Sequence, residues 1–468
     1  MSEDIKTLEP FFKAKSVAII GASGIQGSIG NVLLQNFLNP AYKGKVYPVN
    51  PKYNSISGLK CYPSILEIED HIDLAVIAVP ARLTPKIMQE CVKKGIKAAI
   101  IISGGFSEIG PEGKALEDET IKIAKEGGIR VIGPNCIGVL DTETHIDTFF
   151  LPSWRCDRPR TGNISFISQS GAYAAAISDW SAMLELGISK IISLGNKADV
   201  NDEDIIRYLS KEDPNTKVIC LYIEGFDPGA GRDFIKVAKE VGHETPILVI
   251  KSGRTSRGAA AVSSHTGSLA GSDKVFDGAM KQAGVIRAES FEDMFDMAKA
   301  LAMQPPAKGN RILIVSNGGG VAVMSTDACE SLGLDVPELS EEIQNELKKY
   351  YPAACATHNP IDVIGDTDAK RYEIAFKIAA ASDEVDGVIV GLLLQTPALG
   401  MDVTNIIATY AKQINKPVVV VALGGRFTTQ GAKILEMMGV PVYQTPERAA
   451  KAMYALVKQG EKIYSKEK

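Results

Sequence analysis

The stretch Ser16-Val-Ala-Ile-Ile-Gly-Ala-Ser-Gly-Ile-Gln-Gly27 decides the fold class. Its apolar start is typical of a buried strand, and the glycine and serine turn that follows opens a helical pattern. The same order returns at Ile164-Ser-Phe-Ile-Ser-Gln-Ser-Gly171 and at Ile312-Leu-Ile-Val-Ser-Asn-Gly-Gly319. Because strands that alternate with helices build parallel sheets covered on both faces, the sequence predicts an α/β protein.

The length of 468 residues fits about three domains of ordinary size. Proline-containing connections near residues 151–161 and 304–309 are the expected linkers. We therefore predict domains at residues 1–150, 160–302 and 308–468.

Composition excludes several classes of protein. The net charge of −5 argues against non-specific nucleic-acid binding, and no apolar run approaches the length of about 18 residues that a membrane span needs. The seven cysteines are scattered and form no CxxC pair, so we expect reduced thiols in a cytoplasmic protein. The five histidines are not spaced like metal ligands, and no metal site is expected on this chain.

The second and third domains resemble diverged copies of one unit. Val218-Ile-Cys-Leu-Tyr-Ile-Glu-Gly-Phe226 matches a stretch that begins at Val388. Matching glycines are 31 positions apart in the second domain (Gly253 to Gly284) and 14 apart in the third, a difference of 17 residues. The additional segment contains His265 among glycine, serine and alanine, and we expect a mobile loop there because inserted surface segments often carry function.

The first glycine turn has the properties of a phosphate-binding loop, since backbone N–H groups between a strand and a helix receive anions. Its spacing is G-x-x-G-x-x-G rather than the dinucleotide fingerprint G-x-G-x-x-G. The second strand, Val46-Tyr-Pro-Val-Asn50, ends without the acid that binds an NAD ribose, and Lys52 follows instead. A phosphate-rich ligand without a free ribose diol fits these residues, which leaves CoA and NADP.

Two further helix starts and one acid complete the candidate chemistry. Ser168–Gly171 and Gly318–Gly320 each follow a predicted strand, and both helix dipoles would point at one anion if the two copies face each other. His265 is a suitable nucleophile for a phosphoryl group. Glu224 ends an apolar strand and is placed to hold one imidazole tautomer.

Four motifs together resemble those of the NDP-forming acyl-CoA synthetases, the superfamily of succinyl-CoA synthetase, and within it the α subunits of ADP-forming acetate–CoA ligases. The motifs are Gly21-Ala-Ser-Gly-Ile-Gln-Gly27, Ser168-Gln-Ser-Gly-Ala172, Ser264-His-Thr-Gly-Ser-Leu-Ala-Gly271 and Ser316-Asn-Gly-Gly-Gly320. The resemblance implies a Rossmann-like CoA-binding domain followed by two flavodoxin-like ligase domains with parallel sheets.

The resemblance also implies roles for individual residues. His265 is expected to be phosphorylated and Glu224 to stabilise it. Phosphate is expected at Ser168, Gln169, Ser170, Gly171, Gly318, Gly319 and Gly320. CoA, rather than NADP, is expected at Ser23, Gly24, Ile25, Gln26, Lys52, Val79, Pro80, Ile102, Ser103 and Gly104.

Three domains of these sizes leave no room for the nucleotide-binding ATP-grasp domain of this superfamily, and the chain has no G-x-x-x-x-G-K-[ST] loop. We therefore expect a separate ATP-grasp β subunit that binds ADP or ATP with Mg²⁺, in an α2β2 assembly. The expected activity interconverts acyl-CoA, ADP and phosphate with a carboxylic acid, CoA and ATP through an acyl phosphate and a phosphohistidine. The alternatives are a non-catalytic CoA sensor or scaffold and an NADP-dependent oxidoreductase.

Overall fold

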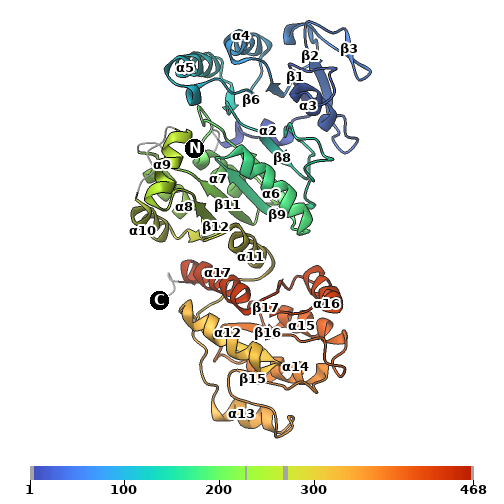
Figure 1. Cartoon of the computed structure of the whole chain (residues 1–468), viewed down its shortest axis with the longest axis vertical. Helices are drawn as coiled ribbons and strands as arrows, with labels where there is room; N and C mark the ends of the chain where they lie inside the picture. Colours follow the sequence, from blue (N-terminus) through green and yellow to red (C-terminus); the bar gives the residue numbers. More distant parts are fainter. Residues whose placement is uncertain (1–4, 227–228, 267–271, 465–468) are drawn as a thin grey trace. The chain divides into compact units, whose positions relative to one another are not determined.

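Three open sheets, each flanked by helices, form the framework of the chain in the computed structural model (Figure 1). The structure describes residues 5–226, 229–266 and 272–464, and for residues 262–266 it describes the backbone alone. The chain divides into two units, Met1–Val285 and Ile286–Lys468. Strands alternate with helices throughout, so the predicted α/β class with mostly parallel sheets is confirmed.

The first sheet is fully parallel and has the order β2-β1-β5-β6-β7. Its strands are β1 (Ser16–Ile20), β2 (Lys45–Val49), β5 (Leu74–Ile77), β6 (Ala98–Ile101) and β7 (Arg130–Ile132). Its other elements are α2 (Pro10–Lys13), α3 (Ile29–Phe37), the hairpin β3 (Ser55–Ile56) and β4 (Leu59–Lys60), η1 (Ile65–Glu67), η2 (Ala81–Leu83), α4 (Thr84–Lys94), η3 (Ser107–Ile109) and α5 (Pro111–Glu126). The chain leaves β1 for β2 and returns as β5, so the topological switch point lies between β1 and β5.

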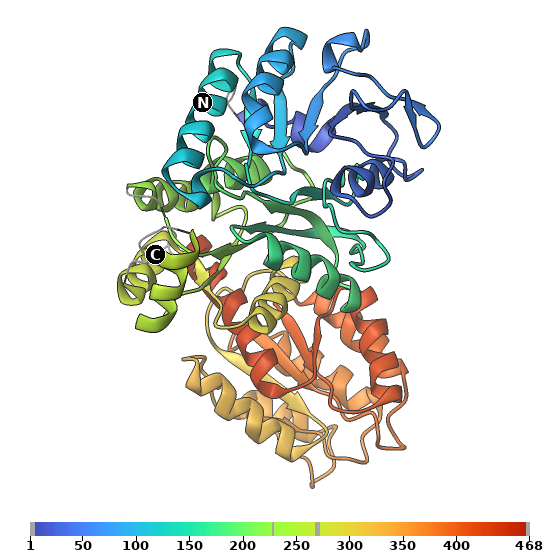
Figure 2. The ribbon, with the colours of Figure 1, turned by 45° about the horizontal axis from the view of Figure 1, so that its top comes forward.

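Helices cover both faces of this sheet because β1 is apolar on both sides (Figure 2). Val17 and Ile19 enter the core that also holds Leu33 and Leu34 of α3. The alternate β1 residues enter a second core, which contains Met88 of α4. A continuous apolar strand of this kind is the sequence signature of a parallel sheet buried on both faces.

The second sheet has the order β13-β12-β11-β9-β10-β8. Its strands are β8 (Gly138–Asp141), β9 (Thr161–Ser168), β10 (Ile188–Ser193), β11 (Val218–Ile223), β12 (Ile247–Lys251) and β13 (Ile286–Arg287). Its helices are α6 (Gly171–Met183), α7 (Asp202–Lys211), α8 (Ala230–Val241), α9 (Ser256–Thr266) and α10 (Asp273–Ala283). Strand β8, from the N-terminal region, joins this sheet antiparallel to β10, which the sequence did not predict.

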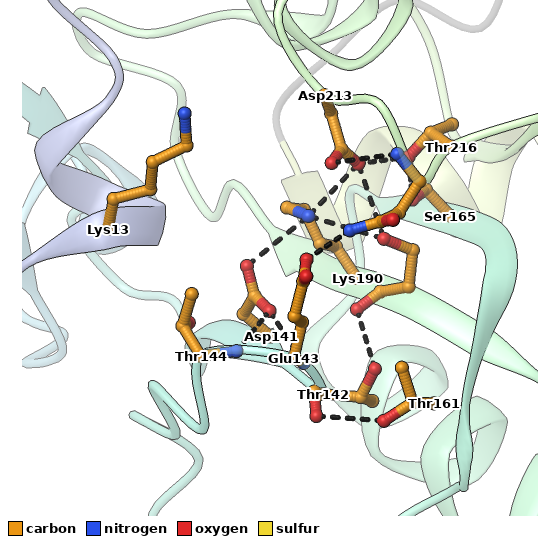
Figure 3. A network of polar contacts seen from close by, with 12 residues as sticks. Lys13, Asp141, Thr142, Glu143, Thr144, Thr161, Ser165, Lys190, Asp213 and Thr216 are labelled. Atoms are coloured by element: carbon orange, nitrogen blue, oxygen red, sulfur yellow. Dashed lines mark hydrogen bonds and ion pairs between the residues drawn. The ribbon is translucent and has the colours of Figure 1, made fainter. Parts of the chain in front are cut away.

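A buried ion cluster ties β8 to β10 (Figure 3). Lys190 Nζ lies 3.3 Å from Asp141 Oδ2 and 2.9 Å from Asp213 Oδ2, and none of the three side chains is more than 4% exposed. Asp213 also accepts hydrogen bonds from Ser189 and Thr216. Because buried charges are costly unless they are paired, this cluster holds the added strand in one register.

The third sheet is parallel and has the order β15-β14-β16-β17-β18. Its strands are β14 (Ile312–Ser316), β15 (Ile361–Asp362), β16 (Gly387–Gly391), β17 (Val418–Val421) and β18 (Val442–Tyr443). The helices of this unit are α11 (Phe291–Met303), α12 (Gly319–Ser331), α13 (Glu341–Lys348), α14 (Ala369–Ala375), η4 (Phe376–Ala380), α15 (Asp402–Gln413), α16 (Arg426–Met437) and α17 (Pro446–Tyr464).

The second and third sheets share one topology, as expected for copies of one unit. Without β8, both have the flavodoxin-like order in which the first strand lies between the second and third. The ladders pair Ser168 with Tyr222 and Ser316 with Gly391. Glu224 therefore corresponds to Leu393, and the sequence match that set Val218 against Val388 is one residue out. Uniformly apolar runs carry too little pattern to define a register.

The additional segment of the second domain is more helical than the sequence predicted. Residues 256–266 form α9, so the expected loop is wrong over that range. Ala259, Ala260 and Ala261 explain the difference, because alanine has the highest helix propensity. Residues 267–271 lie outside the described part of the chain.

Helix α11 packs on α17, with ion pairs between the N-terminal parts of the two helices. Arg448 holds Asp296 through two hydrogen bonds of 2.5 and 2.8 Å, and Lys451 binds Asp293 at 2.9 Å. Lys299 of α11 also bonds Glu436 of α16 at 2.7 Å. The contacts of α11 are thus with the C-terminal unit, and the domain limits expected from the sequence stay a prediction.

The cysteines behave as small apolar side chains. All seven are free, and six are buried while Cys355 is half-buried. Burial raises the pKa of the Cys91 thiol to about 12 and that of Cys136 to about 12. The prediction of unpaired cysteines packed as small apolar residues is confirmed.

Candidate active site

The expected CoA contacts all follow strands of the first sheet at one edge. Ser23–Gln26 come after β1, Lys52 after β2, Val79-Pro80 after β5 and Ile102–Gly104 after β6. The sheet order places the ends of β2, β1, β5 and β6 side by side in that sequence. Ser103 Oγ donates to the Val79 carbonyl and joins two of these turns directly. The structure thus brings the four segments together at the edge where open α/β sheets bind ligands.

The glycines of the first turn serve two purposes. A Cβ on Gly21 would lie 2.3 Å from the Ala78 carbonyl oxygen, and one on Gly30 would lie 2.0 Å from the Gly21 carbonyl oxygen. Both glycines are therefore required by close backbone packing, Gly21 against the end of β5 and Gly30 against the turn after β1. Gly24 is exposed and meets only the Tyr53 ring at 3.3 Å, so its surface is open to a ligand.

Asn50 positions Lys52 beside this turn. The Asn50 side chain donates to the Ala22 carbonyl at 2.8 Å and accepts from the Lys52 backbone N–H at 2.9 Å. The Lys52 side chain is exposed. A cation held next to exposed loop N–H groups suits a phosphate-rich ligand. Asn50 and Tyr53 were not singled out from the sequence, because side-chain contacts between separate strand ends leave no local pattern.

A cleft of about 920 Å³ lies between the first and second sheets, within the N-terminal unit. From the first sheet's side it is lined by the turns that contain Ile102, Glu108 and Asn135. From the second sheet's side it is lined by Gln169–Ala172, by Gly195–Ala198 and by Glu224. One hollow therefore holds part of the expected CoA edge, the expected phosphate site and the expected catalytic acid.

A turn of the second domain docks on the first domain and builds this cleft. Asn196 N–H donates to the Pro134 carbonyl at 2.9 Å, and a Cβ on Gly195 would lie 2.2 Å from the same oxygen. The Asn196 amide also lies 2.7 Å from Glu108 Oε2 and 2.9 Å from Glu117 Oε2. Gly195 is the residue that permits so close an approach.

The charge of Glu108 is stabilised by this docking. Burial alone would raise its pKa, but hydrogen bonds from Asn196 and from the backbone N–H groups of Gly105 and Phe106 outweigh burial and lower the pKa below its usual value. Glu108 is thus an ionised acceptor at the rim of the cleft, and its hydrogen bond with Asn196 helps to hold the first domain against the second.

The turn before α6 is built to leave N–H groups free. Ser168 Oγ donates to the Ser170 carbonyl at 2.7 Å and accepts from the Ser170 N–H at 3.2 Å. Ser168 is fully buried, so its hydroxyl braces the turn instead of facing the cleft. Among the described residues, no group accepts from the N–H of Gly171 or Ala172. These two groups form an anion-binding helix start in the cleft wall.

The start of α12 repeats this construction in the other unit. Ser316 Oγ donates to the Gly318 carbonyl and accepts from the Gly318 N–H, both at 3.1 Å. A Cβ on Gly318 would lie 2.1 Å from Leu393 Cδ1, so a larger residue there would have to displace the end of the leucine side chain. Gly319 and Gly320 follow as the first residues of the helix. Whether the two helix starts face one anion stays a prediction.

Glu224 lies in the cleft wall directly after β11 and is 8% exposed. Its backbone N–H donates to Gln169 Oε1 at 2.9 Å, so β9 and β11 meet at the switch point of the second sheet. His265 belongs to the last turn of α9, and its side chain lies outside the described part of the chain. The contact expected between the imidazole and Glu224 stays a prediction.

A second cleft of about 740 Å³ lies along α3 and residues 152–161. Of the expected site residues it includes Gln26 alone. The described residues contain no cluster of three or more His, Cys, Asp or Glu side chains arranged to hold a metal ion. The first cleft is therefore the candidate active site.

Family models match the chain along most of its length. A CoA binding domain matches residues 15–142, a succinyl-CoA ligase like flavodoxin domain matches residues 161–301, and a ligase-CoA domain matches residues 312–458. No described helix combines the length and apolar character required to cross a lipid bilayer.

Full-length relatives agree with these models. The chain is 42% identical over 461 residues to subunit alpha of acetate–CoA ligase (ADP-forming) I from Pyrococcus furiosus, with 97% of each chain covered. It is 40% identical to acetate–CoA ligase (ADP-forming) I from Archaeoglobus fulgidus and spans 65% of that longer protein. In structure it is similar to a dinucleotide-forming acetyl-coenzyme A synthetase 1 of Ca. Korarchaeum cryptofilum in complex with phosphate and ADP, with a TM-score of 0.90, 39% identity and 98% of both chains covered.

Proposed function

The chain belongs to the family of ADP-forming acyl-CoA synthetases, and on that premise we propose that it is the α subunit of an acetyl-CoA or related acyl-CoA synthetase. It interconverts acyl-CoA, ADP and phosphate with a carboxylic acid, CoA and ATP. The observation that carries the proposal is the cleft of about 920 Å³, because it joins Ile102 of the CoA edge, the α6 helix start and Glu224 in one hollow.

The first step uses the carboxyl edge of the first sheet and the cleft wall formed by the start of α6. CoA binds along the carboxyl edge of the first sheet, with Lys52 and the Ser23–Gln26 turn as its phosphate contacts. Inorganic phosphate binds at the free N–H groups of Gly171 and Ala172. A phosphate oxygen attacks the thioester carbonyl carbon, the carbon–sulfur bond breaks, and CoA leaves as a thiol after protonation. Positioning and N–H donors at the developing charge supply most of the catalysis.

The second step moves the phosphoryl group to the chain itself. A nitrogen of His265 attacks the phosphorus of the acyl phosphate, the bond to the acyl oxygen breaks, and the carboxylate leaves. Glu224 accepts a hydrogen bond from the other ring nitrogen and stabilises the phosphohistidine. The phosphoryl group then passes to ADP. The second helix start, Gly318–Gly320, contributes the other half of the phosphate cradle.

The α-subunit relatives imply a partner subunit, and we assign nucleotide binding to it. An ATP-grasp β subunit would hold ADP or ATP with Mg²⁺ in an α2β2 assembly. The free, buried thiols of this chain suit the reducing cytoplasm.

Label transfer tests the phosphohistidine. We expect the α chain, incubated with γ-labelled ATP, Mg²⁺ and the β subunit, to take up acid-labile label. His265→Ala and His265→Asn should take up none, because neither side chain can form a phosphoramidate. Equal labelling of wild type and either variant contradicts the assignment of His265.

The role of Glu224 is tested in the same assay. Glu224→Gln keeps the size of the side chain but loses its charge, and we expect acyl-CoA formation to fall by about 100-fold. An unchanged rate would remove Glu224 from the mechanism.

Calorimetric titration separates the rival functions. CoA binding together with labelling supports the synthetase, while CoA binding without labelling supports a sensor or scaffold. Binding of NADPH would support an oxidoreductase.

A further inference from the structure

Gln169 forms a bridge between the two strands at the switch point of the second sheet. Its Oε1 accepts the N–H of Glu224 at 2.9 Å and that of Gly225 at 3.3 Å. Its Nε2 donates to Asp202 Oδ2 at 2.9 Å. Its own backbone N–H donates to the Tyr222 carbonyl at 3.2 Å. The polar groups of Gln169 are thus used within the protein rather than offered to the cleft.

Asp202 and Lys197 determine which way this amide points. Asp202 is 2% exposed, begins α7, and binds Lys197 Nζ at 3.0 Å through the same oxygen that receives Gln169. A reversed amide would place its NH₂ group against two N–H donors and its oxygen against a carboxylate. Both contacts are repulsive, so only one orientation is stable.

The third domain contains a similar hydrogen-bonded bridge, but among the described residues no charged side chain orients it. Asn317 corresponds to Gln169, and its Oδ1 accepts the N–H of Leu393 at 2.8 Å, the residue that corresponds to Glu224. The other contacts of Asn317 are neutral, with the Leu393 carbonyl at 3.0 Å, the Tyr372 hydroxyl at 3.0 Å and the Thr396 hydroxyl at 3.4 Å. The bridge is supported by a buried acid, Asp202, and a lysine, Lys197, only in the copy that has a glutamate at the strand end.

We propose that Gln169, oriented by Asp202 and Lys197, is a positioning residue that fixes where the Glu224 carboxylate enters the cleft. The inference rests on the proposed function and deepens it. It also reassigns Gln169, which the family resemblance placed among the phosphate contacts, to a role that acts through Glu224. Phosphate binding at this helix start is left to Ser170 and to the N–H groups of Gly171 and Ala172.

A double-variant cycle tests whether Gln169 acts through Glu224. The readout is the rate at which the complex with the β subunit transfers label from ATP to the α chain. Gln169→Met keeps the side-chain size but removes both hydrogen-bonding ends, and we expect the rate to fall by about tenfold or more. In the Glu224→Gln background the same change should cost less than about twofold, because two residues that act as one unit are not additive.

The KM for phosphate distinguishes positioning from direct phosphate contact. In the direction that consumes acyl-CoA, ADP and phosphate, positioning predicts that Gln169→Met has a lower kcat and an unchanged KM for phosphate. A raised KM for phosphate with kcat unchanged, or equal losses in both backgrounds of the cycle, would overturn the proposal. Gln304→Met is the matched control, because Gln304 similarly binds the Gly439 carbonyl and the Val418 N–H but does not line the cleft. It should lower Tm without changing kcat.

A reversed pair supplies a rescue in case Gln169→Met is poorly folded. Gln169→Glu faces the Asp202 carboxylate, and we expect label transfer to fall at least about tenfold. Adding Asp202→Asn restores a donor opposite an acceptor, and the rate should return to within about threefold of wild type. A double variant no faster than Gln169→Glu contradicts the proposal. Absence of label in wild type itself would refute the proposed function, and the positioning role with it.

Discussion

At the scale of the residue, Glu203 in the first turn of α7 is a buried acid that destabilises the native state when it is ionised. Its side chain is buried, and its Oε1 atom has no hydrogen-bond partner among the described residues. Burial, together with the neighbouring Asp202 charge, raises the pKa of Glu203 to about 7. The acid is therefore protonated in the native state over a pH range in which the unfolded chain has already lost the proton.

This difference predicts a stability that falls as pH rises. Below about pH 4 the Glu203 carboxyl is protonated in both the native and the unfolded state, so its ionisation does not change the free energy of unfolding. Between the unfolded pKa and the native pKa the unfolded state loses its proton first, so the cost grows, and above pH 7 it reaches about 3 kcal/mol. We expect Glu203→Gln to raise the free energy of unfolding at pH 8 by up to about 3 kcal/mol and to change little at pH 4. Urea unfolding at the two pH values measures this.

The control is the exposed Glu119→Gln on α5, for which we expect no such dependence. A stabilisation by Glu203→Gln that is equal at both pH values would contradict the assignment of the cost to ionisation.

At the scale of the element, the first glycine turn contains one glycine that is needed for folding and another that is placed for ligand binding. Gly30 lies where α3 crosses the end of β1, and Gly24 lies on the exposed side of the same turn. The two glycines of this motif are therefore explained differently, Gly30 by close packing and Gly24 by its exposure to a ligand.

We expect Gly30→Ala to destabilise the first domain by roughly 1–3 kcal/mol, because the new methyl group would overlap the Gly21 carbonyl. Gly24→Ala should keep the Tm of wild type but weaken CoA binding, because the methyl group occupies loop surface that the ligand approaches. Thermal unfolding and calorimetric titration with CoA distinguish them. Equal losses of stability in both variants would show that the turn is only a packing feature.

At the scale of the whole molecule, the two units divide the chain differently from the domains expected from the sequence. The expected boundary after residue 302 assigns α11 to the second domain, whereas its ion pairs join α16 and α17. Six apolar residues of α11 are buried, and they are Met294, Phe295, Met297, Ala298, Ala300 and Leu301.

Truncation tests where the C-terminal unit begins. We expect a fragment of residues 286–468 to unfold cooperatively, and a fragment of residues 308–468 to have a lower Tm because the face of α17 that receives α11 is uncovered. The Asp296→Asn variant of the longer fragment should fall between them, since it loses the charge that Arg448 binds. Equal Tm values for the two fragments would favour the boundary expected from the sequence.

The sequence by itself determined the fold class, the duplicated halves and the motifs of the family, because these depend on local periodicity, turn residues and short strings. It also singled out Glu224, since an acid that ends an apolar strand is visible without a structure. The register of the copies was beyond its reach, because uniform apolar strands have no mark that distinguishes a shift of one residue.

Only the tertiary structure decided which side chains meet. Gln169 follows β9, whereas Lys197 and Asp202 lie between β10 and the start of α7. The sheet order, with β9 between β10 and β11, brings these residues together beside the strand end that contains Glu224. Strand β8 joins the second sheet where Lys190, distant in sequence, pairs with both Asp141 and Asp213. Contacts of this kind depend on which strands are neighbours, a property that no local pattern in the chain encodes.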